Sequence, residues 1–185
     1  MPQVDVLVYI PRPAAEVFAF LADGCNLARW HSGVADIRAE GVDYLYRFPG
    51  RRRETRLARS LCAEGSRVSF LGDRLWTPLG SQSPRHDFRV SPRGEGCHVD
   101  IQVTVRLWGG MLALWPVVEL GWRRDLPEDA RRLYRLLTGG QDPAPSAVAR
   151  GGGPGRRGGE RSRGGGLPLR ALLPHRRGVP GPSSG

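Results

Sequence analysis

Alternating apolar and polar residues predict an antiparallel sheet over most of the first 107 positions. The clearest segment is 97–107, where valine, isoleucine or leucine recurs at every second position between polar residues. A strand with one dry face and one wet face is typical of such a sheet. Turn sequences separate the segments. The same period predicts further strands at 4–10, 34–40, 44–48, 53–63, 67–71 and 85–90.

A longer period predicts helices at both ends of this region. Apolar residues at helical spacing favour a helix over 13–22, a helical turn at 26–30 and helical structure over 110–138. Pro127 interrupts the last segment, and Asp125 with Glu128 forms a capping-box pattern around it. The sequence therefore allows either one helix kinked near Pro127 or two helices in series. Gly139-Gly140 predicts its C-terminal cap.

The composition changes near residue 142. Residues 143–185 contain 12 glycines and 7 prolines but few large apolar side chains. Such a segment cannot recover the ~1–2 kcal/mol per residue that ordering costs. We predict one domain over 1–140 and a disordered Gly/Pro/Arg-rich tail over 141–185.

Most of the positive charge lies in that tail. The formal net charge is +10, and residues 143–185 hold 8 arginines with a single acidic residue, against 20 arginines and 17 acidic residues before them. A basic tail can bind phosphates weakly in a salt-dependent way, which makes an interaction protein with a nucleic-acid-binding tail one alternative. The tail has no aromatic residue to stack on bases, so we expect no specific nucleic-acid partner. A passive extension, or a misread reading frame, is the other interpretation.

Other sequence signals are weak. The three widely spaced cysteines, Cys25, Cys62 and Cys97, form neither a disulfide framework nor a metal motif, which fits a reducing compartment. The N-terminus lacks a signal-peptide pattern. The apolar stretch 111–120 falls short of the ~20 residues that span a bilayer. We expect no membrane span, no cofactor, no metal and, by default, a cytoplasmic location; the oligomeric state is left open.

The first helix and its flanks resemble a known family. The closing helix, Asp129 through Leu137, is similar to the end of the same family, and the resemblance covers residues 1–140. The motif that carries it is Ile10-Pro11-x-Pro13-Ala14-Ala15-Glu16-Val17-Phe18-Ala19-Phe20-Leu21-Ala22-Asp23, followed by Asn26 and Trp30. It resembles the opening of the polyketide cyclase/dehydrase and lipid-transport family of the START-like (SRPBCC) superfamily.

This resemblance implies a fold and a ligand. The fold is the α+β helix-grip fold, a curved antiparallel sheet of about six or seven strands wrapped around a long C-terminal helix. The gap between sheet and helix would be an apolar cavity of ~300–1,000 Å³ that holds a lipid, a quinone or a polyketide-like aromatic.

The predicted strand faces then name the ligand-binding residues, although each could equally serve packing alone. Inward positions of the sheet would contribute Phe70, Phe88, Val90, Ile101, Val103 and Val105. The long helix would add Leu112, Trp115 and Leu120, and Trp30, Tyr44 and Tyr46 would lie near the mouth.

A cyclase/dehydratase-type enzyme in the same pocket is the alternative function. His86 is the first catalytic candidate, because it shares a strand face with Phe88 and imidazole transfers protons near neutral pH. Arg59 is the second, since an inward guanidinium can orient a carbonyl or carboxylate. His31 would lie at the entrance and His98 on the wet face. The predicted middle strand lacks the tryptophans of aromatase/cyclase members, so the sequence leaves open whether the protein is an enzyme.

Overall fold

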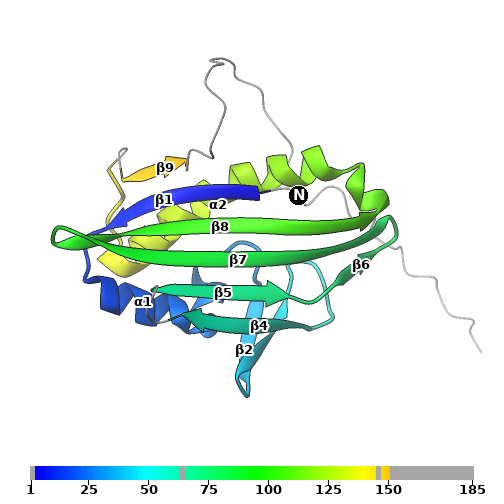
Figure 1. Cartoon of the computed structure of the whole chain (residues 1–185), viewed down its shortest axis with the longest axis horizontal. Helices are drawn as coiled ribbons and strands as arrows, with labels where there is room; N and C mark the ends of the chain where they lie inside the picture. The colour runs from blue at the N-terminus through cyan, green and yellow to red at the C-terminus, as the bar shows by residue number, and fades with distance from the viewer. Residues whose placement is uncertain (1–2, 63–65, 145–146, 151–185) are drawn as a thin grey trace, which may run out of the picture. The chain divides into compact units, whose positions relative to one another are not determined.

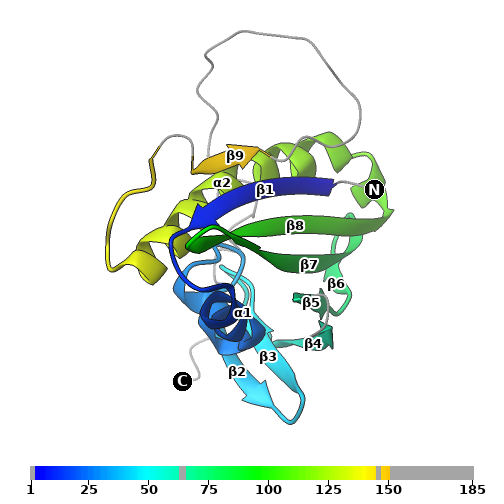
Figure 2. The same ribbon diagram turned by 60° about the vertical axis from the view of Figure 1, so that its left-hand side comes forward.

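The fold is an antiparallel sheet with one long helix packed across a face. The computed structural model describes residues 3–62, 66–144 and 147–150, all within one compact unit. The described residues form nine strands in the order β2-β3-β4-β5-β7-β8-β1-β9, with β6 paired to β7 alone. The sheet curves, and α2 runs over its concave side (Figures 1 and 2). This arrangement confirms the predicted α+β class.

The strands and helices follow the predicted order, with two short strands added. Their bounds are β1 (Gln3–Ile10), α1 (Ala14–Ala22), the 3₁₀ helix η1 (Gly24–Arg29), β2 (Asp36–Glu40), β3 (Asp43–Arg47), β4 (Thr55–Cys62), β5 (Arg67–Gly72), β6 (Leu75–Thr77), β7 (Gly80–Arg93), β8 (Gly96–Gly109), the 3₁₀ helix η2 (Gly110–Leu112), α2 (Trp115–Thr138) and β9 (Val148–Arg150).

The predicted strand 85–90 is much longer than its sequence indicates. β7 continues back to Gly80, through Pro84, and pairs with β8 along its whole length. Proline is tolerated there because the pairing of β7 with β5 ends at Arg85 and that with β6 begins at Gln82. The missing N–H of Pro84 therefore lies where one edge of β7 has no ladder partner.

The segment 110–138 resolves into a short 3₁₀ turn followed by one continuous helix. Pro116 lies in the first turn of α2, and Pro127 lies inside the helix, so the capping-box pattern around Pro127 marks no helix start. An interior proline removes one helical hydrogen bond, but Leu126 and Ala130 on either side are fully buried, and their packing holds the helix together. Gly139 ends the helix in a left-handed conformation (φ 74°), as predicted.

The ordered unit extends past the predicted boundary at residue 140. β9 pairs with β1 through Leu7 and Ala149 and their neighbours, and the amide of Tyr9 donates to the carbonyl of Ala147. β9 covers the edge of β1 that would otherwise expose unpaired backbone groups. The expectation of a tail without regular structure is thus wrong for residues 148–150, and residues 151–185 lie outside the described part of the chain.

Candidate functional site

The inner face of the sheet is apolar, as its period of two predicts. Phe70 and Phe88 are fully buried and their ring centroids lie 6.0 Å apart. The predicted pocket residues on β7 and β8 are also at most 2% exposed: Val90, Ile101, Val103 and Val105. The structure therefore brings together every sheet residue that the sequence nominated, on the face that α2 covers.

The face of α2 that meets the sheet differs from the predicted one. Leu112 precedes α2 in η2 and is 62% exposed, Leu120 is 68% exposed, and Trp115 is 37% exposed. The expectation that these three side chains face inward is wrong. The buried stripe of α2 instead passes through Trp122, Leu126, Asp129, Ala130 and Leu133. α2 continues through Pro127 as one helix. The side chains that are buried after Pro127 therefore also fix which side chains before it face the sheet.

The aromatic residues expected at the mouth are buried in the interior. Tyr44 packs edge-on against Phe70. Its ring fits there because Gly24 has no side chain, since a Cβ at Gly24 would lie 2.7 Å from the Tyr44 ring. Trp30 is 1% exposed and packs edge-on against Phe88. Tyr46 is 3% exposed. They line the same interior as the sheet residues rather than an opening.

Two of these aromatics carry buried polar atoms without a hydrogen bond among the described residues. They are the indole Nε1 of Trp30 and the hydroxyl of Tyr46. Tyr46 crosses over Gly72 and Pro84, where a Cβ added to Gly72 would lie 3.1 Å from its hydroxyl oxygen. Burial raises the pKa of Tyr46 to about 12, so the hydroxyl stays protonated and can donate. Leaving a buried donor unsatisfied costs ~1–3 kcal/mol.

His86 lies on this inner face and contacts a second buried histidine. In the sheet it stands between Phe70 of β5 and Val103 of β8. Its Nδ1 is 3.1 Å from Nε2 of His31, and the two rings are nearly perpendicular. The Trp122 ring packs edge-on against both imidazoles, with centroids 5.9 Å from His31 and 5.8 Å from His86. His31, only 2% exposed, is thus an interior residue and not the entrance residue that the sequence predicted.

The turn after η1 holds His31 in place. Its amide donates to the carbonyl of Leu27 at 2.8 Å, and its Nδ1 accepts from the amide of Gly33 at 3.0 Å. Because Nδ1 accepts, the ring proton of His31 sits on Nε2 and points to Nδ1 of His86. The proton of His86 is then on its own Nε2, which takes part in none of the hydrogen bonds among the described residues.

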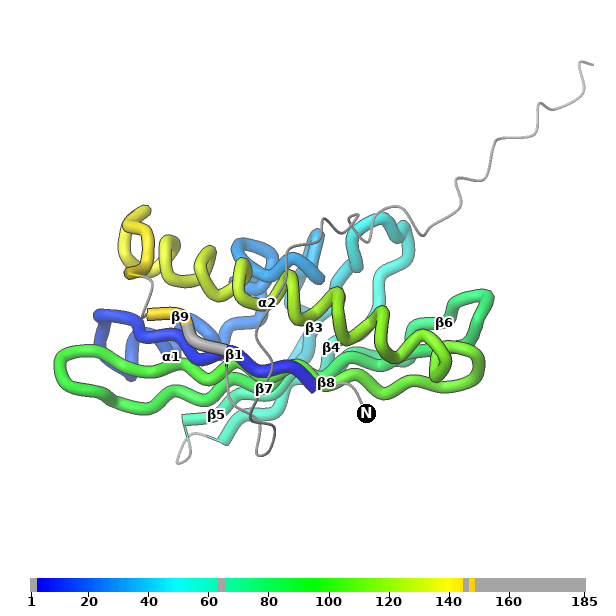
Figure 3. Tube along the Cα trace, turned by 90° about the horizontal axis from the view of Figure 1, so that it is seen from above, coloured from blue at the N-terminus to red at the C-terminus, as the bar shows by residue number. Residues whose placement is uncertain are grey.

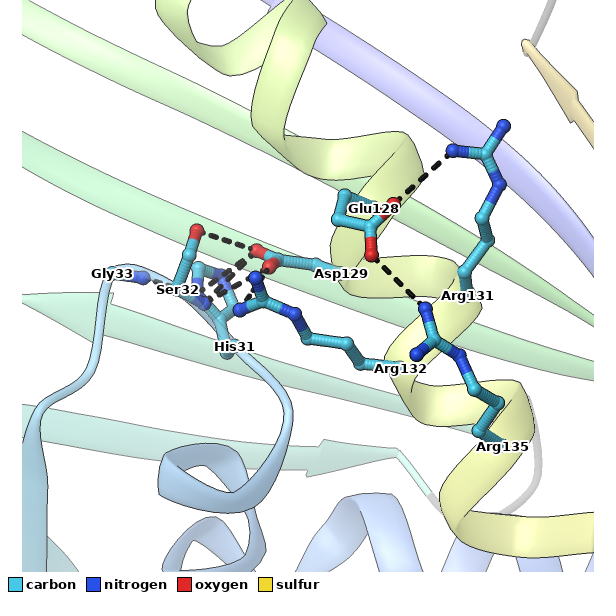
Figure 4. Close-up of polar contacts among 8 residues, drawn as sticks. All are labelled: His31, Ser32, Gly33, Glu128, Asp129, Arg131, Arg132 and Arg135. Carbon is cyan, nitrogen blue, oxygen red and sulfur yellow. Dashed lines mark hydrogen bonds and ion pairs between the residues drawn. The ribbon is translucent and has the colours of Figure 1, made fainter. Parts of the chain in front are cut away.

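Asp129 of α2 points toward the turn that carries His31 and Ser32 (Figure 4). Its carboxylate accepts from the amide of Ser32 at 3.1 Å and from the Ser32 hydroxyl at 2.9 Å. One carboxylate oxygen lies 3.6 Å from Nδ1 of His31, and Arg132 lies 3.7 Å from the other. Asp129 itself has no exposed surface. We call His31, His86 and Asp129 the buried triad.

Burial controls the protonation of the triad. It raises the pKa of Asp129 to about 7, although the hydrogen bonds from Ser32 and the charge of Arg132 act in the opposite direction. It lowers the pKa of His86 to about 4 and that of His31 well below its ordinary value, with the neighbouring His86 as a further cause for His31. At neutral pH both imidazoles are therefore neutral, and Asp129 is present in both its protonated and its ionised form.

Arg59 serves the first helix rather than the interior. Its Nη1 donates to the carbonyl of Ala22, the last residue of α1, at 3.1 Å, and to the hydroxyl of Tyr44 at 3.2 Å. A cation at a helix C-terminus satisfies a free carbonyl and favours the helix dipole. The catalytic role suggested for Arg59 remains a prediction, but the guanidinium is already engaged in these contacts.

His98 and the surface groove lie apart from the buried triad. His98 lies on the outer face, half-buried, with its ring 5.7 Å from that of Tyr9. An open groove of about 320 Å³ lies between α1 and the last turns of α2, and none of the nominated pocket residues lines it. Within the described ranges, no histidine, cysteine or carboxylate group is arranged to hold a metal ion. No helix among the residues described is long and apolar enough to cross a bilayer.

Sequence reasoning missed Asp129, Trp122 and Ser32 as members of the site. One available signal was the position of Asp129 on the apolar stripe of its helix, three residues after Leu126 and four before Leu133. A carboxylate on a buried stripe needs a partner and marks a candidate site. No pattern in the sequence links Asp129 to His31, because the two come together only when α2 crosses the turn after η1.

The architecture is shared with several solved proteins. A conserved protein of Geobacillus kaustophilus is 11% identical with a TM-score of 0.55, covering 74% of this chain and 95% of its own. A protein of Thermus thermophilus is 19% identical with a TM-score of 0.57, covering 75% and 98%. The di-domain ARO/CYC protein BexL of the BE-7585A biosynthetic pathway is 17% identical with a TM-score of 0.58, covering 73% and 46%. Identities this low show the fold alone.

A family model supplies the relationship that these structures leave open. A comparison with curated proteins finds no match. The model described as polyketide cyclase/dehydrase and lipid transport matches residues 1–138. This range holds β1 through α2 and the whole buried triad. The chain belongs to the polyketide cyclase/dehydrase and lipid-transport family.

Proposed function

We propose that this protein binds an apolar small molecule bearing a hydrogen-bond acceptor, in the interior between the sheet and α2. Quinones and polyketide-like aromatics have this character, since their carbonyl groups are set in a flat apolar frame. A saturated lipid chain lacks it. The apolar inner face around Phe70 and Phe88 supports the apolar part of the proposal.

The single observation that carries the proposal is a pair of donors, Trp30 Nε1 and Tyr46 OH, that find no acceptor within the described part of the chain. Both belong to side chains at least 97% buried. Buried polar groups in native proteins nearly always have partners. An acceptor oxygen of a bound ligand would satisfy such donors, and the Nε2–H of His86 adds another on the same face.

A matched pair of probes tests this proposal on the full chain. 9-Fluorenone and fluorene have nearly the same shape and differ in one carbonyl oxygen. We expect 9-fluorenone to bind more tightly, as measured by calorimetric titration, and its carbonyl stretching frequency to fall on binding. Tyr46→Phe removes only the hydroxyl, and should weaken 9-fluorenone about five- to tenfold, since one hydrogen bond is worth ~1 kcal/mol. It should leave fluorene unchanged.

Tyr9→Phe is the control for this substitution. Tyr9 lies on β1, between the inward Val8 and Ile10, and so faces away from the interior. It should bind both probes as the wild-type chain does. Equal affinity of the wild-type chain for the two probes would refute the acceptor requirement. Failure of both probes to bind would refute the interior as a ligand site.

A cyclase/dehydratase-type reaction in the same interior is the second candidate function. Such reactions move protons between carbon and oxygen atoms of the substrate, and general acid–base catalysis typically contributes 10²–10⁴-fold. The contact of 3.1 Å between His31 and His86 favours this candidate, because an apolar core needs no such pair for packing.

A further inference from the structure

The buried triad joins α2 to the inner face of the sheet through a line of polar atoms. From Asp129 the line passes to Nδ1 of His31 at 3.6 Å, and from Nε2 of His31 to Nδ1 of His86 at 3.1 Å. It ends at Nε2 of His86, whose partners on the neighbouring strands are Phe70 and Val103. The link between the two imidazoles has one donor and one acceptor. Nδ1 of His31 accepts from the Gly33 amide at 3.0 Å, and the Asp129 carboxylate stands beside it at 3.6 Å, just beyond hydrogen-bond distance.

We infer that Asp129, His31 and His86 form a proton relay that delivers a proton to an oxygen atom of the bound ligand. This inference rests on the proposed function, because it needs a ligand oxygen at Nε2 of His86. His86 is the residue that meets the ligand, and His31 and Asp129 act through it. The ligand class is an enolate, a phenolate or a carbonyl in an apolar frame.

The proton balance of the relay closes within the protein and the ligand. The carboxyl group of protonated Asp129 first closes the gap of 3.6 Å and replaces the Gly33 amide as the partner of Nδ1 of His31. Its O–H bond then breaks and the proton moves to Nδ1 of His31. The proton on Nε2 of His31 moves to Nδ1 of His86, and the proton on Nε2 of His86 moves to the ligand oxygen. Both imidazoles end neutral in the opposite tautomer, and the charge lost by the ligand appears on Asp129.

The contacts around Asp129, His31 and His86 are consistent with proton transfer among them. The carboxylate left behind keeps the hydrogen bonds from Ser32 and lies near Arg132. Trp122 packs edge-on against both imidazoles. Burial disfavours an imidazolium at either ring, which favours a concerted shift of protons over a charged intermediate.

Few other charged groups of residues 3–62, 66–144 and 147–150 act on Asp129. On α2 itself they are Arg132 and, one turn earlier, Asp125. The turn after η1 presents His31 and Ser32. β1 and β8 turn buried apolar residues toward the interior. Asp87 acts on His86 from the opposite face of β7. Asp129 is therefore the group that the relay draws its proton from.

Histidine tautomers report the relay directly. The full chain, labelled with ¹⁵N-histidine, is titrated with the phenolate of 4-nitrophenol, and long-range ¹H–¹⁵N spectra show which ring nitrogens carry protons. Without the probe we expect His31 and His86 neutral and protonated at Nε2. With the probe both should change to Nδ1–H, and the yellow phenolate absorbance should fall.

Two aspartate variants separate the relay from a merely structural role. Asp129→Asn keeps the size and polarity of the side chain but has no proton to give, so both histidines should stay protonated at Nε2 with the probe present. Asp36→Asn, at an exposed aspartate of β2 that pairs with Arg47, should behave as the wild-type chain does. His98 should show no change in any variant.

Each outcome decides the inference. A tautomer change that depends on Asp129 supports the relay. Wild-type spectra that do not change, or change equally in Asp129→Asn, overturn it. Binding of 9-fluorenone to the same sample tells the two proposals apart: if it binds while the tautomers stay fixed, the ligand site stands and the relay fails. If neither probe binds, the proposed function fails as well.

Discussion

The two faces of β7 give two neighbouring titratable residues, His86 and Asp87, very different hydrogen-bond partners. Asp87 turns to the outer face, where Arg67, Ser69 and Arg85 donate hydrogen bonds to it. His86, one residue earlier, turns to the inner face, where its one hydrogen-bond partner among the described residues is His31. Figure 3 shows α2 lying over this inner face.

Two aspartates show what this difference does to acidity. Burial alone raises the pKa of Asp87, but the hydrogen bonds from Arg85, Ser69 and Arg67 outweigh it and the pKa lies below its ordinary value. Asp129 is buried more deeply, and burial raises its pKa to about 7, because its hydrogen bonds within the described part of the chain come only from Ser32 and its arginine is farther away. Deeper burial and a weaker set of charged partners together keep Asp129 close to its protonated form, whereas Asp87 stays ionised.

The largest predicted effect is on the free energy of unfolding, and it distinguishes adjacent residues on the two faces of β7. Phe88→Ala removes a ring that is fully buried between Trp30 and Phe70, and should lower the free energy of unfolding by about 3–5 kcal/mol. Arg89→Ala, its exposed neighbour, should change it by less than about 0.5 kcal/mol. Urea denaturation measures both, and similar losses in the two variants would contradict the assignment of the faces.

The next effect concerns pH and Asp129. The folded-state pKa of about 7 exceeds the ordinary carboxylate value near 4, so between these values the native state holds a proton that the unfolded chain has lost. Stability due to this group therefore falls as pH rises from about 4 to 7, by roughly 4 kcal/mol. Asp129→Asn lacks this loss.

The measurement for Asp129 is the difference in unfolding free energy between Asp129→Asn and the wild-type chain at each pH. This difference should move in favour of the variant from pH 4 to 7 and then level off. Taking the difference removes the opposing contribution of His31 and His86, whose lowered pKa values make stability rise with pH over a similar range. A difference that is flat with pH would show that Asp129 is ionised throughout.

The smallest effect belongs to the outer face. Asp87→Asn removes an ion pair whose arginines, Arg67 and Arg85, are about half exposed, so it should cost only about 1 kcal/mol at low salt. Since exposed charges are screened, the cost should shrink further in 1 M sodium chloride, roughly a 3 Å Debye length. The Asp129→Asn difference should depend on salt much less. Equal salt dependence of the two would contradict the contrast between the faces.

The parts of the site that could be predicted are those set by local periodicity. The alternation in β8 placed Ile101 and Val103 on the inner face, and the same rule placed His86 and Phe88 beside them. Leu112 and Leu120 were misplaced because a helical period names an apolar stripe without saying how far the helix continues through Pro127. Leu120 is exposed because it lies on the outer side of one unbroken helix, and Leu112 because it belongs to the 3₁₀ turn η2 that precedes this helix.

His31 and Asp129 show the other limit. His31 follows a short 3₁₀ turn with no period to orient it, and Asp129 is 98 positions away along the chain. Their encounter depends on where α2 crosses the turn that carries Ser32 and Gly33. β9 is a similar case, since three residues carry little periodic signal and pair only because β1 offers an open edge.

By itself, the sequence determined the α+β class, the succession of strands and helices, the apolar face of the sheet and the glycine that ends α2. These depend on side-chain alternation and on backbone conformations that neighbouring residues already dictate. Tertiary structure alone decided which face of α2 is buried, that Trp30 and Tyr46 keep unsatisfied donors, and that an aspartate meets two histidines away from water. These depend on contacts between distant segments and on desolvation, which exist only once the chain has packed.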